Sequence, residues 1–296
     1  KLKLNYVDDD KEFAGQDRLT FNNNNQDPTR GQSVLVYQFM NDAGVNSPRS
    51  NLARVIVNGE DLGIYTHVES VRKPFIKRLF GKSKGDLWEG FAGDFTESEY
   101  GRIIHKWGKD DDSANLQPLY DLLQEPDAIP LAAFEELIDL DSFITFWASE
   151  VLIGHWDGYA SGSNNFYVYK STDDGLLHFI PFGPDATFEN EDSDGLYAYT
   201  ALSMRLWNHP DGQARYLAES QRLLDDVWDE TWLHSEIDRM EALIEPHLLD
   251  SELTKGSIVK VRAFVDGRRA TVQAAIDERP GRQEYEQMGL NQRFHP

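Results

Sequence analysis

Alternating apolar and polar positions at the start of the chain predict a strand-rich region. Residues 1–7, KLKLNYV, alternate and predict a strand. Residues 51–70 hold two further alternating runs on either side of Asn58-Gly59, which predicts a hairpin. Between these strands, residues 33–44 have apolar positions at helical spacing. Asp27 or Thr29 precedes this stretch as a candidate cap, and Gly44 is placed to end the helix.

Farther along, the hydrophobic pattern becomes mainly helical. Residues 73–81 predict a short helix ending at Gly81, whereas residues 85–130 are weakly patterned. Residues 140–156 are apolar on nearly every side, so we expect a buried central helix across 143–153, with Phe146, Leu152 and Ile153 in the core. Two strands, 165–170 and 176–182, follow around a turn at 172–175. Helical patterns then occupy 211–228, 232–249 and 258–278.

This distribution predicts an α+β fold. Strands dominate roughly the first 70 residues and helices dominate the second half of the chain. We therefore expect one domain over residues 1–296, built from a small β-rich lobe at 1–70 and a larger, mainly helical lobe at 71–296. A functional site is expected between the two lobes.

Composition narrows the classes of function. The 296 residues carry a formal net charge of −22, which disfavours non-specific nucleic-acid binding. A metal ion, a metal–nucleotide complex or a basic protein would be attracted by the negative electrostatic field of such a chain. The acidity is also explained simply by solubility. Cysteine is absent, which excludes disulfides, a thiolate nucleophile and a Cys-based zinc site. We identify no apolar run long enough to span a membrane and no signal peptide, and the chain opens as if inside a strand.

One loop combines an acid with two amides. In HWDGYASGSNNFYVYK, Asp157 follows the apolar helix, and Asn164 and Asn165 stand just before the next strand. A further acid, Asp185, follows the second strand of the hairpin. Carboxylate and amide oxygens are the ligands that magnesium prefers, and phosphotransfer centres use such groups to orient a hydroxyl and hold metal. Asp and Asn also make ordinary turns, so the pattern alone leaves both interpretations open.

Several segments, in order, resemble the CotH kinase-like family of atypical protein kinases, which is named for a bacterial spore coat protein. They are RLTFNNNNQDPTR, FMNDAGVNSPRSNLARVIVNGEDLGIYTHVESV, FGKSKGDLWEG, the stretch around HWDGYASGSNNFYVY, and FIPFGPDATF. The resemblance covers most of residues 1–245. It implies a two-lobed atypical protein-kinase-like fold, ATP with Mg²⁺ or Mn²⁺ as cofactors, and an extracellular or cell-surface location.

The resemblance also implies roles for individual residues. Asp157 would be the catalytic aspartate, Asn165 or Asn164 would be the amide ligand to metal, and Asp185 would be an acidic metal ligand. The family commonly carries an acid two positions before Asp185, where this chain has Gly183.

Nucleotide contacts are less clearly marked. Lys1 and Lys3 are the early candidates for a lysine that pairs with phosphate. Glu69 would either contact the nucleotide or pair with Arg72 or Lys73.

Three functions are compatible with these observations. The first is a protein kinase that transfers the γ-phosphate of ATP to Ser or Thr hydroxyls of an extracytoplasmic or surface protein. The second is a catalytically degenerate surface or adhesion module that keeps the fold. The third is a hydrolase using the carboxylates of Asp157 and Asp185. Nucleotide binding would separate the first two, because a ligand that binds the folded state stabilises it.

Overall fold

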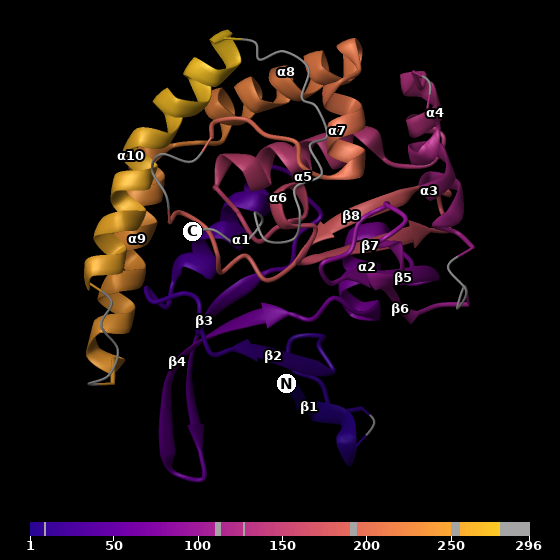
Figure 1. Cartoon of the computed structure of the whole chain (residues 1–296). Helices are drawn as coiled ribbons and strands as arrows, with labels where there is room; N and C mark the ends of the chain where they lie inside the picture. The colour runs from indigo at the N-terminus through magenta and orange to yellow at the C-terminus, as the bar shows by residue number, and fades with distance from the viewer. Residues whose placement is uncertain (9, 110–113, 127, 190–193, 250–254, 279–296) are drawn as a thin grey trace.

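The computed structural model describes residues 1–278 except 9, 110–113, 127, 190–193 and 250–254. These residues form two four-stranded antiparallel sheets and a set of helices, with much of the first sheet below the helices in the view of Figure 1. The α+β class predicted from the sequence is therefore confirmed.

The first sheet has the strand order β1-β2-β4-β3. Its strands are β1 (Leu2–Lys3), β2 (Arg18–Asn22), β3 (Ser50–Val57) and β4 (Glu60–Glu69). The predicted hairpin is present as β3 and β4, and its tip projects away from the rest of the molecule (Figure 1). The strand predicted over 1–7 is wrong beyond Lys3, because a 3₁₀ turn, Leu4–Tyr6, follows at once. None of residues 1–7 is buried. The alternation of apolar and polar residues there therefore does not correspond to one buried and one exposed face of a strand.

The second sheet has the order β6-β5-β7-β8. Its strands are β5 (Gly85–Gly90), β6 (Ile103–Trp107), β7 (Phe166–Ser171) and β8 (Leu177–Pro181). The last two are the predicted hairpin, whereas β5 and β6 lie in the segment that seemed weakly patterned. β5 has consecutive buried residues at its centre, because both of its faces are covered. Such a strand shows no alternation of apolar and polar residues.

Helix α1 (Gln32–Asp42) lies between β2 and β3 along the chain. Its N-cap position is Gly31, and both candidate capping residues accept N–H groups of its first turn. The hydroxyl oxygen of Thr29 accepts the N–H of Gln32 at 2.9 Å, and the Asp27 carboxylate accepts the N–H of Ser33 at 3.1 Å. Gly44 follows with a φ of +88°, a conformation that glycine adopts readily. The sequence-based expectation for this helix is confirmed at both ends.

Helix α5 (Leu140–Leu152) is the central buried helix. Asp139 caps its first turn by accepting the N–H of Ser142 at 3.2 Å. Phe146, Leu152 and Ile153 are all buried, as predicted. Its C-terminal end therefore leaves the core at a fixed place, directly before the Asp157 loop.

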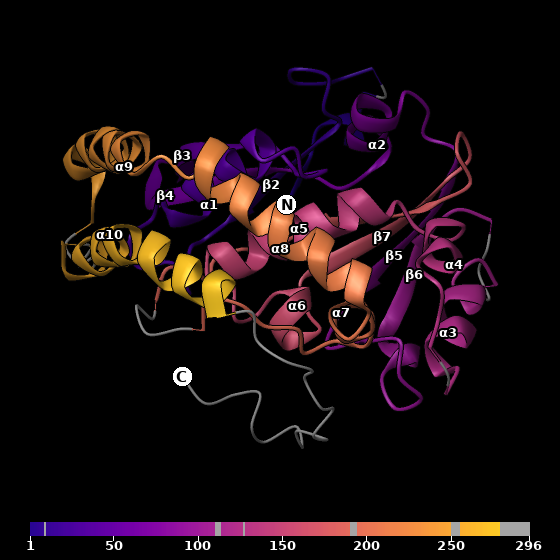
Figure 2. The ribbon, with the colours of Figure 1, turned by 90° about the horizontal axis from the view of Figure 1, so that it is seen from above.

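The remaining helices pack around this centre. They are α2 (Lys73–Phe80), α3 (Gln117–Gln124), α4 (Leu131–Glu135), α6 (Tyr159–Gly162), α7 (Ala201–Trp207), α8 (Pro210–Asp226), α9 (Glu230–Ile244) and α10 (Lys255–Glu278), with short 3₁₀ turns at Tyr100–Arg102 and Glu245–His247. α8 packs on α5, and α9 and α10 lie side by side at the end of the molecule opposite the second sheet (Figure 2). Among the described helices, none combines the length and the apolar character that a membrane crossing requires.

Candidate active site

The loop that carries Asp157 is built on a buried acid. Glu150, in the last turn of α5, is fully buried, and its carboxylate accepts the backbone N–H groups of Tyr159 at 3.2 Å and Ala160 at 2.8 Å. A carboxylate at the start of the short helix α6 satisfies donors that have no partner within the helix. Glu150 thus ties the end of α5 to the residues just after Asp157. Glu150 was not singled out from the sequence, although an acid among the apolar residues near the end of this helix was a usable signal.

A glycine lets the same loop fold tightly. The buried imidazole of His155 lies with Nδ1 3.5 Å from Oε1 of Glu150. A β-carbon on Gly158 would lie 2.4 Å from that Nδ1 and 2.6 Å from Oε1 of Glu150. No side chain fits at this position without moving the buried pair, so the backbone path around Asp157 depends on Gly158.

Both predicted amides contact Asp157. Nδ2 of Asn164 donates to Oδ1 of Asp157 at 3.1 Å, and Nδ2 of Asn165 donates to Oδ2 at 2.8 Å. Asn165 also donates to the backbone oxygen of Asp157 at 2.9 Å. Each carboxylate oxygen therefore has a donor that fixes its direction.

The two amides differ in the use of their oxygens. Oδ1 of Asn164 accepts the backbone N–H of Ala92 at 3.1 Å, so this side chain is held at both ends. Oδ1 of Asn165 faces Gly183, where an added β-carbon would lie 3.0 Å away. Among the described residues, no donor bonds to this oxygen. Of the two, Asn165 therefore has the amide oxygen available for a ligand.

The β7–β8 hairpin brings Asp185 to the same place. Asn165 precedes β7 and Phe182 follows β8, and the N–H of Phe182 donates to the backbone oxygen of Asn165 at 2.9 Å. Residues separated along the chain thus become neighbours across the hairpin. Helix α1 holds the next turn, because Nε2 of Gln32 donates to the backbone oxygen of Asp185 at 3.0 Å.

Electrostatics also link Asp185 to Asp157. Burial raises the pKa of Asp185 above its ordinary value of 3.8, and the charge of Asp157 adds to that rise. Nδ2 of Asn22, the last residue of β2, lies 3.5 Å from Oδ2 of Asp185 and opposes the rise. The nearby negative charge makes the ionised form of Asp185 more costly, and a cation bound beside Asp185 would offset that cost. Asn22 was missed from the sequence, where it seemed to be only the start of an Asn-rich loop.

The candidate nucleotide-binding residues have other contacts. The buried Glu69 pairs with Arg49 at 2.9 Å and Arg78 at 2.7 Å, so the expected partners Arg72 and Lys73 are wrong. Nζ of Lys3 lies 5.9 Å from the ring centre of Tyr6. Burial raises the pKa of Glu89, but donation from its neighbours and the nearby charge of Lys1 hold it below its ordinary value. A nucleotide role for Lys1, Lys3 and Glu69 stays a prediction.

A model of a known protein family matches nearly the whole chain. The model described as CotH kinase protein matches residues 1–280. The chain belongs to the CotH kinase family. It is therefore a kinase-like protein, as the resemblance of its segments implied.

Curated relatives of this CotH-family chain include spore coat and invasin proteins. It is 23% identical over 272 residues to the inner spore coat protein H of Bacillus subtilis, covering 84% of this chain and 73% of that protein. It is 25% identical over 235 residues to the invasin CotH2 of Rhizopus delemar, covering 67% of this chain and 40% of the invasin. The match thus spans less than half the length of the invasin.

One solved structure aligns with most of the chain at a low TM-score. It is the crystal structure of a Helicobacter pylori proinflammatory kinase, CtkA, at 11% identity and a TM-score of 0.44, covering 88% of this chain and 89% of that one.

The oxygens of this CotH-family site fit a hard cation. Among the described residues, no three His, Asp or Glu side chains converge as a metal-binding group. Magnesium in nucleotide sites needs only one or two carboxylates, because phosphate oxygens and water complete its shell. The carboxylate of Asp185 and the unused amide oxygen of Asn165 meet that requirement.

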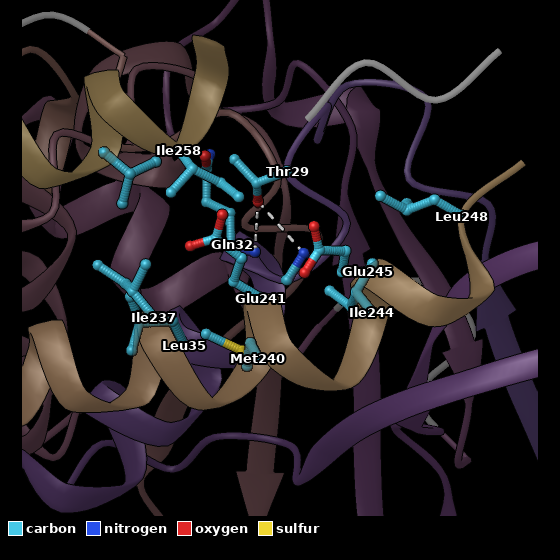
Figure 3. A pocket seen from close by; sticks show the side chains of 12 residues that line it. Thr29, Gln32, Leu35, Ile237, Met240, Glu241, Ile244, Glu245, Leu248 and Ile258 are labelled. Carbon is cyan, nitrogen blue, oxygen red and sulfur yellow. Dashed lines mark hydrogen bonds between the residues drawn. The ribbon is translucent and has the colours of Figure 1, made fainter. Parts of the chain in front are cut away.

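A pocket lies next to the site, and Asp157 is not among the residues that line it. It is enclosed by the start of α1 and by α9 and α10, with apolar walls that include Met240 and Ile258 (Figure 3). Gln32 lines it and also bonds the backbone oxygens of Asp185 and Thr187, at 3.0 and 2.6 Å. The pocket contains none of the predicted site residues, and we assign no chemistry to it.

Proposed function

We propose that the chain is a protein kinase that transfers the γ-phosphate of ATP to a Ser or Thr hydroxyl, with Mg²⁺ or Mn²⁺ bound. The observation that supports this most strongly is the Asp157 carboxylate, held by two amides and electrostatically coupled to Asp185. A fixed carboxylate beside a cation site is what phosphotransfer requires, since its catalysis consists mainly of positioning and charge stabilisation.

Each residue has a defined part in this proposal. Asp157 accepts a hydrogen bond from the acceptor hydroxyl and orients it, while Asn164 keeps the carboxylate in place. Asp185 and Asn165 would hold the divalent cation, which supplies positive charge beside the transferred phosphate. Lys1, Lys3 and Glu69 remain the candidates for nucleotide contact on the first sheet.

The acceptor is proposed to be a protein outside the cytoplasm or on a surface. This part rests on the relatives, whose names place one in a spore coat and call another an invasin.

A non-catalytic surface or adhesion module is the second candidate. It is favoured by Gly183, which stands where the family commonly has an acid, and by the name invasin in the relatives. This module would keep the fold and would not need the cation site.

Nucleotide binding distinguishes the two. Thermal unfolding should be measured with ATP, with and without Mg²⁺ or Mn²⁺. A kinase should be stabilised by ATP and metal together, because the ligand binds only the folded state. Asp185→Ala should weaken this stabilisation. Asp157→Asn should preserve it and abolish radiolabelled phosphate transfer.

Asp226→Asn provides a matched control, because this acid is exposed on α8, far along the chain from the loop residues. It should behave like the wild type in both assays. Wild-type protein that gains no stability from ATP at saturating metal would rule out the kinase and leave the adhesion module.

A further inference from the structure

Large apolar side chains are exposed close to Asp157. Phe91 is 71% exposed, Ile104 is 55% exposed and Trp156 is 38% exposed. We refer to these three residues as the apolar rim. Other exposed large apolar side chains lie in the N-terminal segment (Leu2, Tyr6, Val7 and Phe13), near the tip of the β3–β4 hairpin (Ile56, Val57 and Leu62), and on α9 and α10 (Leu243 and Val259).

Phe91 is connected to Asp157 by a short series of contacts. It is followed by Ala92, whose N–H donates to Oδ1 of Asn164 at 3.1 Å, and Nδ2 of Asn164 donates to Asp157 at 3.1 Å. The next residue, Gly93, donates to the backbone oxygen of Ser163 at 2.7 Å. The backbone beside Phe91 is therefore fixed to the loop that positions the carboxylate.

Ile104 lies on one defined face of the second sheet. In β6 it pairs directly with Glu89 of β5, which pairs in turn with Tyr167 of β7, so these three side chains share a face. The hydroxyl of Tyr167 donates to Glu89 at 2.7 Å. The charge of Lys1 acts on Glu89, which places the start of the first sheet near this face. Gly90, which directly precedes Phe91, pairs with Ile103, so Ile104 lies beside the end of β5 that leads into Phe91.

Trp156 adjoins Asp157 directly along the chain. Its Nε1 donates to Oε2 of Glu189 at 2.9 Å. This bond holds the indole while part of the ring stays exposed. Exposed apolar surface therefore adjoins Asp157 both at Trp156 and at Phe91.

An acceptor segment of a protein substrate fits this surface. Its hydroxyl must come within hydrogen-bonding distance of Asp157, so the residues around it must lie over the neighbouring surface. An extended chain advances about 3.3 Å per residue, which brings side chains one or two positions from the acceptor over residues adjoining the loop. Apolar side chains that are exposed together beside a site are typical of a binding surface.

We propose that the apolar rim binds the acceptor segment and selects a large apolar side chain within two residues of the acceptor Ser or Thr. This inference rests on the proposed kinase function and defines its substrate class. The occupant is an extended segment of another protein.

The test compares two short peptides that each contain one serine. One has leucine two residues from the serine, and the other has glycine at that position. Wild-type protein should show a kcat/KM about tenfold higher for the leucine peptide, the scale of one apolar contact. Phe91→Ser and Ile104→Ser should remove most of this preference. Leu243→Ser, at an exposed apolar position on α9, should retain it.

A binding measurement distinguishes failure of the kinase proposal from failure of the apolar-rim proposal. Anisotropy of the labelled leucine peptide should be measured with the same variants and without nucleotide. If wild-type protein transfers no phosphate but binds this peptide through Phe91 and Ile104, the kinase proposal fails and the apolar rim stands. Phosphate transfer to both peptides at equal kcat/KM overturns the proposal that the apolar rim selects the acceptor segment. Without transfer, binding that is absent or unaffected by Phe91→Ser overturns it as well.

Discussion

A β-carbon on Gly183 would lie 3.0 Å from the amide oxygen of Asn165, the oxygen that the site leaves available for a ligand. Gly183 has a φ of +59°, in the left-handed region. The position where the CotH kinase family commonly has an acid therefore adjoins the candidate cation site directly. The missing acid would have pointed toward the same ligand.

Gly183→Asp is expected to strengthen metal-dependent ATP binding and to lower stability. The new carboxylate would join Asp185 and Asn165 as a hard oxygen ligand. The left-handed backbone would cost about 1–2 kcal/mol for a residue with a β-carbon. Denaturant unfolding and ATP titration with Mn²⁺ measure the two effects. Gly183→Ala is the control, with a similar loss of stability and no gain in affinity. Equal affinities of the two variants would contradict a cation site here.

The two neighbouring asparagines should separate binding from turnover. Asn165→Ala removes the available amide oxygen together with a donor to Asp157, so we expect both the rate to fall and metal-dependent ATP binding to weaken, the latter by about tenfold or more. Asn164→Ala should leave ATP binding largely intact. Asn164→Ala removes a donor that orients Asp157, and a misplaced catalytic group can cost about 100-fold in rate. ATP titrations and initial rates of both variants test this. Identical defects in the two variants would show that the amides act as one unit.

Phe146→Ala should strongly destabilise the fold. Phe146 is fully buried in α5, and its ring centre lies 6.1 Å from that of Phe179 and 6.3 Å from that of Tyr159. Truncating a buried Phe to Ala costs about 3–5 kcal/mol, because a cavity remains. Chemical denaturation measures the loss, with the exposed Phe91→Ala as control, expected within about 0.5 kcal/mol of wild type. A loss near zero for Phe146→Ala would mean that α5 is not the central core helix.

Local patterns were sufficient for much of the fold. The caps and the glycine around α1, the Asn-Gly hairpin and the apolar α5 were all recognisable, because each depends on residues close together in sequence. β5 and β6 were missed, since burial of both faces of β5 removes the alternation that identifies a strand.

Part of the candidate site was also recognisable from residues that lie close together in sequence. Asp157 and its two asparagines lie in one loop, so their approach follows from local sequence. Asn22 reaches Asp185 from the first sheet, and pairing between distant segments leaves no local signal. The difference between Asn164 and Asn165 depends on the N–H of Ala92, which also comes from a distant strand end.

The ion-paired Glu69 gives a prediction about pH. Burial alone would raise the pKa of Glu69, but hydrogen bonds from Arg49 and Arg78 outweigh it and hold the pKa below its ordinary value of 4.5. A lowered pKa in the folded state means that the charged carboxylate stabilises the fold above the unfolded-state pKa. That contribution is lost as pH falls through the lowered value.

Glu69→Gln should therefore lower the free energy of unfolding at neutral pH by about 1–3 kcal/mol, the range for hydrogen bonds to charged groups. The lower part of this range is expected, because Arg49 is 58% exposed and water screens its charge. The difference from wild type should shrink as pH falls below the lowered pKa, where the wild-type carboxyl is also neutral. Denaturant unfolding at a series of pH values measures it. Asp61→Asn, which breaks the more exposed pair with Arg54, is the control and should cost much less. A difference for Glu69→Gln that stays constant with pH would show that the carboxylate charge does not contribute to stability.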